Sequence, residues 1–205
     1  KTNADAFQLP VRLFPREIIW NNFPEAMAKI PYVRYMMNTI FITLLSVVGQ
    51  MVATPLVAYS LAKIKWKGAP IISALIMGTM MIPYTVTMIP LYKIWSRLGF
   101  TNTYVPLILP TFFGSPFYII IMRQFFAGLP NSLMEAAKID GANEFQVFTK
   151  ICIPICKGVI TTCAILVFMD YWNMVEQPLL FFNDTDKYPL SIFLSKINAQ
   201  EVGLA

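Results

Sequence analysis

Four long apolar stretches constrain this sequence more than any other feature. They run from about residue 36 to 62, 70 to 92, 104 to 122 and 155 to 182. Each approaches or exceeds the length of about 20 residues that a helix needs to cross the hydrocarbon core of a bilayer. We therefore predict an all-α integral membrane protein, a polytopic helix bundle with four spans in this chain.

Composition agrees with a membrane protein of packed, bent helices. Hydrophobic residues make up 57% and charged residues 13% of the chain, against about 45–50% and about 25% in soluble domains. Proline and glycine are tolerated in membrane helices where neighbouring helices satisfy the freed backbone groups. In the second and third stretches they include Pro83, Pro90, Pro106, Pro110, Gly114 and Pro116.

Several functional classes are excluded by what the chain lacks. It contains no histidine, which removes Ser-His-Asp and Cys-His catalysis and the usual zinc sites. Its cysteines, Cys152, Cys156 and Cys163, are odd in number and form no C-x-x-C pair, so we expect buried small residues and no metal site. The net charge of +5 is small and scattered, which argues against nucleic-acid binding. We predict no catalytic residue.

Basic residues predict the orientation. Lys63, Lys65 and Lys67 directly follow the first stretch, and such clusters favour the cytoplasmic side. Residues 123–150 then lie in the cytoplasm too, and the loop 93–103 lies outside. The predicted domains are an extracytoplasmic connector (1–34), a transmembrane domain (35–182) with a cytoplasmic segment (127–154), and an extracytoplasmic loop (183–205). Because the chain starts with Lys1 and both ends look cut, we expect six spans in the full protein.

The segment between the third and fourth stretches predicts a helix-turn-helix on the cytoplasmic face. Residues 132–135, Ser-Leu-Met-Glu, have the pattern of a capping box that begins a helix. Gly141 allows a sharp change of direction and ends that helix. A second short helix follows with Phe145, Phe148 and Ile151 at a spacing of three, and Pro154 ends it.

This segment resembles the EAA motif of ABC importer permeases. Glu135-Ala136-Ala137, then Gly141, then Ile151-Cys152-Ile153-Pro154 have the spacing of that motif, with Ile153 where Leu is usual. Asp140-Gly141-Ala142 and Phe148 resemble its carbohydrate branch. The alternative interpretation is a generic amphipathic pair of interfacial helices.

Other stretches resemble the second permease subunit of maltose-type sugar importers. They are residues 81–92, 98–104 and 172–179, so the resemblance covers nearly the whole chain from about Pro31. Gly158 stands where many relatives have a second proline, which leaves the bend of the fourth span open.

The resemblance implies a division of labour. The segment would be the coupling helix that inserts into a separate ATPase subunit, through Glu135, Ala136, Ala137, Asp140, Gly141, Phe148, Ile151 and Pro154. No glycine is followed by lysine, so this sequence has no P-loop, and ATP with Mg²⁺ is expected on the partner. The implied partners are a second homologous permease subunit, an ATPase dimer, an extracytoplasmic solute-binding protein, a sugar and membrane lipid, in a bacterial or archaeal cytoplasmic membrane.

Polar residues in the fourth stretch are candidates for the solute path. Asp170 and Glu176 lie in an apolar run, where each charge would cost roughly 2.5–3.5 kcal/mol at mid-membrane. One hypothesis is that Asp170-Tyr171-Trp172-Asn173 faces an aqueous path. The other is that these groups tie helices together before Pro178. Tyr84, in the proline-broken second stretch, has the same two interpretations.

The predicted function is that of a transmembrane subunit of an ATP-driven ABC importer, which moves a sugar or oligosaccharide by alternating access. The alternatives are an ABC permease for another solute class and an ion-coupled secondary transporter. An internal repeat would favour the latter, and none is visible. A membrane assembly protein with no transport role would have no reason to carry the spacing of residues 135–154.

Overall fold

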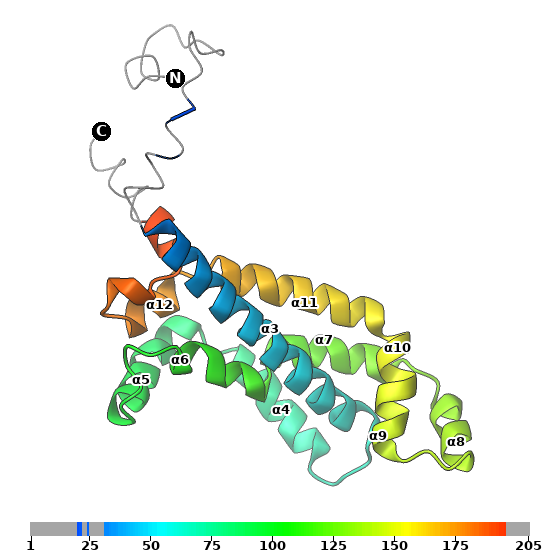
Figure 1. Ribbon diagram of the computed structural model, residues 1–205. Helices are drawn as coiled ribbons and strands as arrows, with labels where there is room; N and C mark the ends of the chain where they lie inside the picture. The colour runs from blue at the N-terminus through cyan, green and yellow to red at the C-terminus, as the bar shows by residue number, and fades with distance from the viewer. Residues whose placement is uncertain (1–19, 22–23, 25–30, 196–205) are drawn as a thin grey trace, which may run out of the picture.

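The computed structural model describes residues 20, 21, 24 and 31–195, and among them all regular secondary structure is helical (Figure 1). The predicted all-α class is therefore confirmed. Most of the predicted connector (1–34) and the last part of the predicted loop (183–205) lie outside the described residues. The helices, with their bounds, are α3 (Tyr32–Lys63), α4 (Ala69–Met80), α5 (Tyr84–Arg97), α6 (Val105–Ile108), η1 (Leu109–Phe113), α7 (Pro116–Ala127), α8 (Asn131–Ile139), α9 (Glu144–Val147), the π-helical turn η2 (Phe148–Cys152), α10 (Ile153–Ile155), α11 (Lys157–Trp172), α12 (Glu176–Phe181) and η3 (Thr185–Lys187).

The 32-residue helix α3 runs through the bundle and packs against α7, α11 and η1. Its buried face consists largely of small residues, which let neighbouring backbones approach closely. The opposite face carries large apolar side chains that are 43–74% exposed, as expected for a surface in contact with lipid. The small buried residues are Thr39, Thr43, Ser46, Gly49, Ala53, Thr54 and Ala58, and the large exposed ones are Val33, Met37, Phe41, Leu44, Val48, Val52 and Leu56.

Two of the predicted spans correspond to helices that are long and apolar enough to cross a membrane. These are α3 and the 23-residue run Val105–Ala127, which joins α6, η1 and α7. Two further pairs of helices qualify only if each bent pair forms one span. The described residues therefore provide between two and four spans, where the sequence predicts four.

The second predicted span is not one straight helix. It bends by 103° between α4 and α5, because Pro83 has no backbone N–H to continue the helix and has the extended ψ of 137°. At 1.5 Å per residue α4 is about 18 Å long and α5 about 21 Å long. Either alone is short of the roughly 30 Å of a hydrocarbon core.

The fourth predicted span, 155–182, is not one continuous helix either. A bend of 79° at Cys156 separates residues 144–155 from α11, and α11 ends at Trp172. Asn173 is its C-cap residue, and both its backbone N–H, at 3.1 Å, and its side-chain amide, at 2.9 Å, donate to the Met169 carbonyl. Glu176 consequently lies in the first turn of α12, where the helix dipole favours a negative charge.

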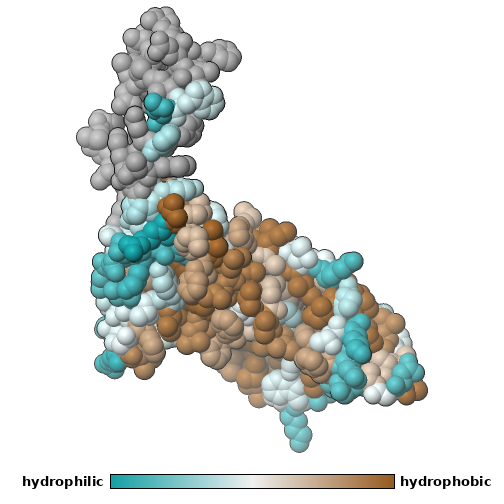
Figure 2. All heavy atoms as spheres, in the orientation of Figure 1, coloured by the Kyte–Doolittle hydropathy of each residue, from teal (hydrophilic) through white to brown (hydrophobic). Residues whose placement is uncertain are grey.

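The bundle has two chemically distinct ends, named here after the predicted orientation. At the inner end Lys63 bonds to Leu129 and Asn131. At the outer end Arg34 pairs with Asp186 at 2.5 Å. Figure 2 shows hydrophobic side chains across the middle of the face in view and hydrophilic ones toward both ends. The segments that the sequence assigns to one side of the membrane thus lie together.

Two glycines should respond oppositely to alanine. A Cβ at Gly49 would overlap the Thr111 hydroxyl, whereas a Cβ at Gly158 would meet nothing within 4 Å. We expect Gly49→Ala to lower the melting temperature of the detergent-purified protein, because α3 and η1 must separate. Gly158→Ala should leave the melting temperature unchanged or raise it, because the higher helix propensity of alanine adds at most about 1 kcal/mol to the free energy of unfolding. Equal effects of the two changes would contradict the close packing at Gly49.

Candidate functional site

The inner end carries the predicted coupling segment, residues 127–154. Its first helix, α8, follows Pro130 and has no side-chain cap, so the predicted capping box at Ser132 and Glu135 is wrong. The capping box instead begins α9. There Gln146 N–H donates to Asn143 Oδ1 and Asn143 N–H donates to Gln146 Oε1, each at 2.9 Å. The Asn-x-x-Gln pattern could have been read from the sequence, since asparagine is a strong N-cap residue.

The turn between α8 and α9 follows the prediction. Gly141 has φ +87°, a left-handed conformation that favours glycine. The hydrogen bond from Ala142 N–H to the Ala137 carbonyl, 2.9 Å, closes the turn. Glu135, Ala136 and Asp140 are exposed, as are Gly141 and Pro154, whereas Ala137 and Ile151 are half-buried.

Phe148 does not face outward with the other motif residues. It is 7% exposed and belongs to the main core cluster, with its ring centroid 5.1 Å from that of Tyr59 and 6.4 Å from that of Phe126. Its role in the structure is to anchor the segment to α3 and α7. This inward direction could not be predicted, because the spacing of a motif does not reveal which way a side chain points.

Two apolar side chains, neither of them among the predicted coupling residues, are the most exposed in the segment. Ile139 is 86% exposed and Phe145 is 67% exposed, on either side of the turn at Gly141. Large exposed apolar groups at a protein surface mark sites of interaction with another protein or a membrane. A signal was present, because both residues stand among polar neighbours.

Charged groups link the segment to α3. Glu144 pairs with Lys138 across the turn and accepts a hydrogen bond from the Tyr59 hydroxyl at 3.0 Å. Lys138, and secondly Tyr59, hold the pKa of Glu144 below its ordinary value, so the carboxylate is ionised at neutral pH. A cleft of about 470 Å³ lies here between the end of α3 and α8, and its lining includes Tyr59, Lys63, Lys65, Glu135, Lys138 and Glu144.

A smaller polar pocket, of about 210 Å³, lies between α3, α7 and α11 and the residues that follow α11. The Tyr118 hydroxyl donates to Asp170 Oδ2 at 2.5 Å. Gln50 Oε1 accepts hydrogen bonds from the Ser115 N–H at 2.9 Å and from the Thr54 hydroxyl at 2.8 Å. The lining residues are Gln50, Ser115, Tyr118, Asp170, Tyr171, Met174 and Gln177.

The structure brings only part of the predicted path residues together. Asp170 and Tyr171 line the polar pocket. Trp172 instead stacks on Phe168, with ring centroids 5.2 Å apart, and the Asn173 amide caps α11. The Tyr84 hydroxyl is buried and has no hydrogen-bond partner within the part of the chain that the structure describes, and it does not line the pocket. Gln50 and Tyr118 were not predicted. A signal for Gln50 was present, because it and Asn38 are the two amide side chains in the uncharged stretch of residues 36–62.

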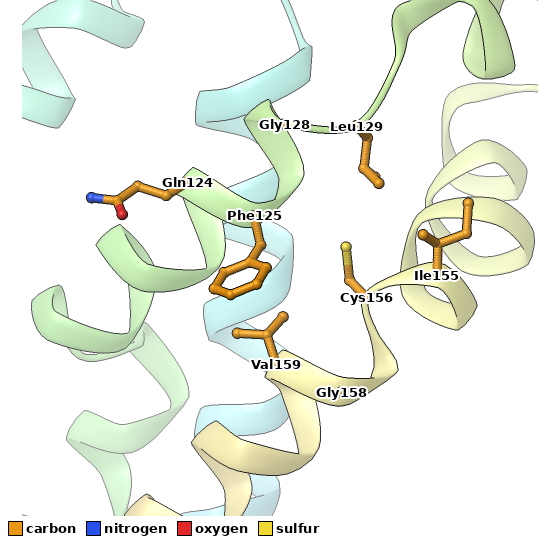
Figure 3. Close-up of a pocket in the computed structure, with 8 residues that line it drawn as sticks. All are labelled: Gln124, Phe125, Gly128, Leu129, Ile155, Cys156, Gly158 and Val159. Carbon is orange, nitrogen blue, oxygen red and sulfur yellow. The ribbon is translucent and has the colours of Figure 1, made fainter.

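A third cavity, of about 540 Å³, is apolar and lies at the bend between α10 and α11 (Figure 3). Phe125 of α7 and Val159 of α11 point toward one another across it. Cys156 also lines it; all three cysteines are buried and free, as predicted. Apart from the Gln124 amide and the Cys156 thiol, the side chains that line this cavity among the described residues are apolar, so it offers little hydrogen bonding to a polar solute.

The comparisons with known proteins agree with the resemblance of the sequence. Residues 46–200 match the family described as binding-protein-dependent transport system inner membrane component, and the chain belongs to this family. It is therefore a membrane protein of a transport system.

Individual relatives are similar over most of the chain. Protein LplC of Bacillus subtilis is 35% identical over 96% of this chain and 65% of its own length. The arabinooligosaccharide permease AraQ of Halalkalibacterium halodurans is 33% identical over 78% of this chain and 57% of its own length. A crystal structure of a bacterial ABC transporter involved in alginate import matches with a TM-score of 0.86 and 28% identity, over 94% of this chain and 68% of that one. The chain thus spans less than two thirds of the length of these two curated relatives.

Substitution of two phenylalanines of the coupling segment should distinguish a residue that anchors the segment, Phe148, from one that lies at its surface, Phe145. Phe148→Ala should destabilise the protein by about 3–5 kcal/mol, because it removes a buried ring. Phe145→Ala should change stability by no more than about 0.5 kcal/mol. Thermal melting of the two purified variants measures the difference. A stable Phe148→Ala variant would contradict the anchoring role.

Proposed function

We propose that this chain is part of a transmembrane subunit of an ATP-driven importer that moves a sugar or oligosaccharide across a bacterial or archaeal cytoplasmic membrane. The observation that carries the proposal is the segment 127–154. It has the spacing of the EAA motif and forms an exposed helix-turn-helix at one end of a membrane helix bundle. The relative named for arabinooligosaccharides supports a sugar as the solute.

The importer would act through partner subunits. A dimer of ATPases would bind ATP and Mg²⁺ and receive the coupling segment, with Ile139 and Phe145 as the apolar contacts in its groove. A second homologous permease would complete the bundle, and an extracytoplasmic binding protein would deliver the solute at the outer end. This chain would perform no covalent chemistry; movement of the coupling segment would switch the bundle between inward and outward access.

The polar pocket around Asp170 is the best candidate for part of the solute path. Asp170, Tyr171, Gln50 and Gln177 offer hydrogen-bonding groups beside apolar surface, which suits the mixed surface of a sugar ring. The alternative is that the Tyr118–Asp170 hydrogen bond only ties α7 to α11. The two hypotheses differ in whether transport or stability depends on the charge of Asp170.

The decisive experiment is uptake of labelled oligosaccharides by proteoliposomes that hold the full complex. Glu135→Arg and Gly141→Val should leave membrane insertion normal but lower uptake per ATP hydrolysed, because one changes the charge and the other the conformation of the surface offered to the ATPase. Thr149→Val is the matched control, since its hydroxyl bonds only to the Phe145 carbonyl one turn earlier. Normal uptake and normal hydrolysis in both variants would refute the assignment.

Asp170→Asn tests the path. Asparagine still accepts the hydrogen bond from Tyr118 but carries no charge, so uptake per assembled complex should fall severalfold at unchanged complex yield. Tyr118→Phe serves as the comparison, because it loses a hydrogen bond worth about 1–3 kcal/mol when buried and should lower the melting temperature. If Asp170→Asn lowers only the yield and transports normally per complex, the residue is structural.

A further inference from the structure

We propose that Tyr59 and Lys63 are the positioning residues that make α3 move together with the coupling segment. The inference rests on the proposed function and names the part of this chain that receives the displacement. It is carried by hydrogen bonds from the last two turns of α3 to both helices of the segment.

Tyr59 joins α3 to the second helix of the segment. Its side chain is 4% exposed, and its ring packs against Phe126 and Phe148, with centroids 6.0 and 5.1 Å away. Its hydroxyl reaches past this apolar cluster to donate to Glu144, in the first turn of α9. Apolar contacts alone are non-directional and allow sliding, whereas this hydrogen bond fixes where α9 lies along α3.

Lys63 joins α3 to the residues that connect α7 to α8, the first helix of the segment. Its ammonium donates to the Leu129 carbonyl at 2.6 Å, to Asn131 Oδ1 at 2.9 Å and to the Ala127 carbonyl at 3.4 Å. Its three donors are thus all used on residues that lead from α7 into α8. A displacement of α8 must therefore carry the end of α3 with it or break these bonds.

Movement of α3 would reach the polar pocket. Gln50, which holds the Ser115 N–H at that pocket, lies on α3 nine residues before Tyr59, or about 13 Å along the axis at 1.5 Å per residue. The same helix therefore bears the contacts to the coupling segment and one wall of the pocket. Tyr59 and Lys63 would act through α3 and need not touch solute or ATP.

The test measures whether ATP changes access to the pocket. Gln177→Cys places a thiol in the pocket lining, and its rate of modification by a membrane-impermeant maleimide is followed in the reconstituted complex, with and without ATP and vanadate. The native cysteines are buried, and the complex without the added cysteine gives the background. Tyr59→Phe keeps the ring packing, Lys63→Met keeps the aliphatic chain, and Thr149→Val is the control.

We expect ATP and vanadate to change the modification rate severalfold in the parent complex and in Thr149→Val. In the double variant Tyr59→Phe, Lys63→Met, the ratio of the modification rates with and without ATP and vanadate should fall to near unity while ATP is still hydrolysed. The Lys63→Arg variant should retain the ratio of the parent complex. If the double variant does not assemble, Tyr59→Phe alone should reduce the change. Variants that keep the full change overturn this inference, and so does a Tyr59→Phe variant that loses only thermal stability. Absence of any change in the parent complex would instead contradict the proposed function.

Discussion

The close approach of other helices to the small-residue face of α3 is the constraint on which the rest of the structure depends. At Gly49 there is room only for hydrogen, because Thr111 and Phe112 of η1 occupy the space a side chain would need. Among its polar members, Thr39 donates to the Tyr35 carbonyl and Thr54 to Gln50, whereas the buried hydroxyls of Thr43 and Ser46 have no hydrogen-bond partner among the described residues. Because its side chains are short, α7 and α11 can pack directly against this face.

This packing explains how the neighbouring segments tolerate so many interruptions. The chain turns sharply at Pro83, reverses its backbone conformation at Gly114, with φ +81°, and bends at Cys156. Each break frees backbone groups that would be costly in hydrocarbon, and such breaks are tolerated where protein surrounds them. At Gly114, Thr54 of α3 is among the nearest neighbours.

Much of the fold could be predicted from the sequence because its two strongest signals are physical. Stretch length and the absence of charge located α3 and most of the run 105–127, which the sequence predicts as 104–122. The orientation predicted from the lysines after α3 stays a prediction. The bend angles at Pro83 and Cys156 could not be predicted. A proline in the sequence shows where a helix can break, but it does not show how far the chain turns there. Among site residues, Asp170 was visible as a charge in an apolar run, whereas Gln50 and Tyr118 become neighbours of Asp170 only through packing. The inward direction of Phe148 likewise depends on Tyr59, which is 89 residues earlier in the sequence.

The hydrogen bond between Tyr118 and Asp170 also bears on how the chain enters the membrane during synthesis. Its two residues are 52 positions apart, so α7 is made before α11 leaves the ribosome. An aspartate at the centre of a helix inserting alone costs roughly 2.5–3.5 kcal/mol, and the cost is smaller for Asp170, which lies in the last turn of α11. When α11 inserts, α7 is already in the membrane, so the Tyr118 hydroxyl is available to donate to the Asp170 carboxylate. The order of the helices along the chain thus lets an early segment ease the insertion of a later one that carries a charge.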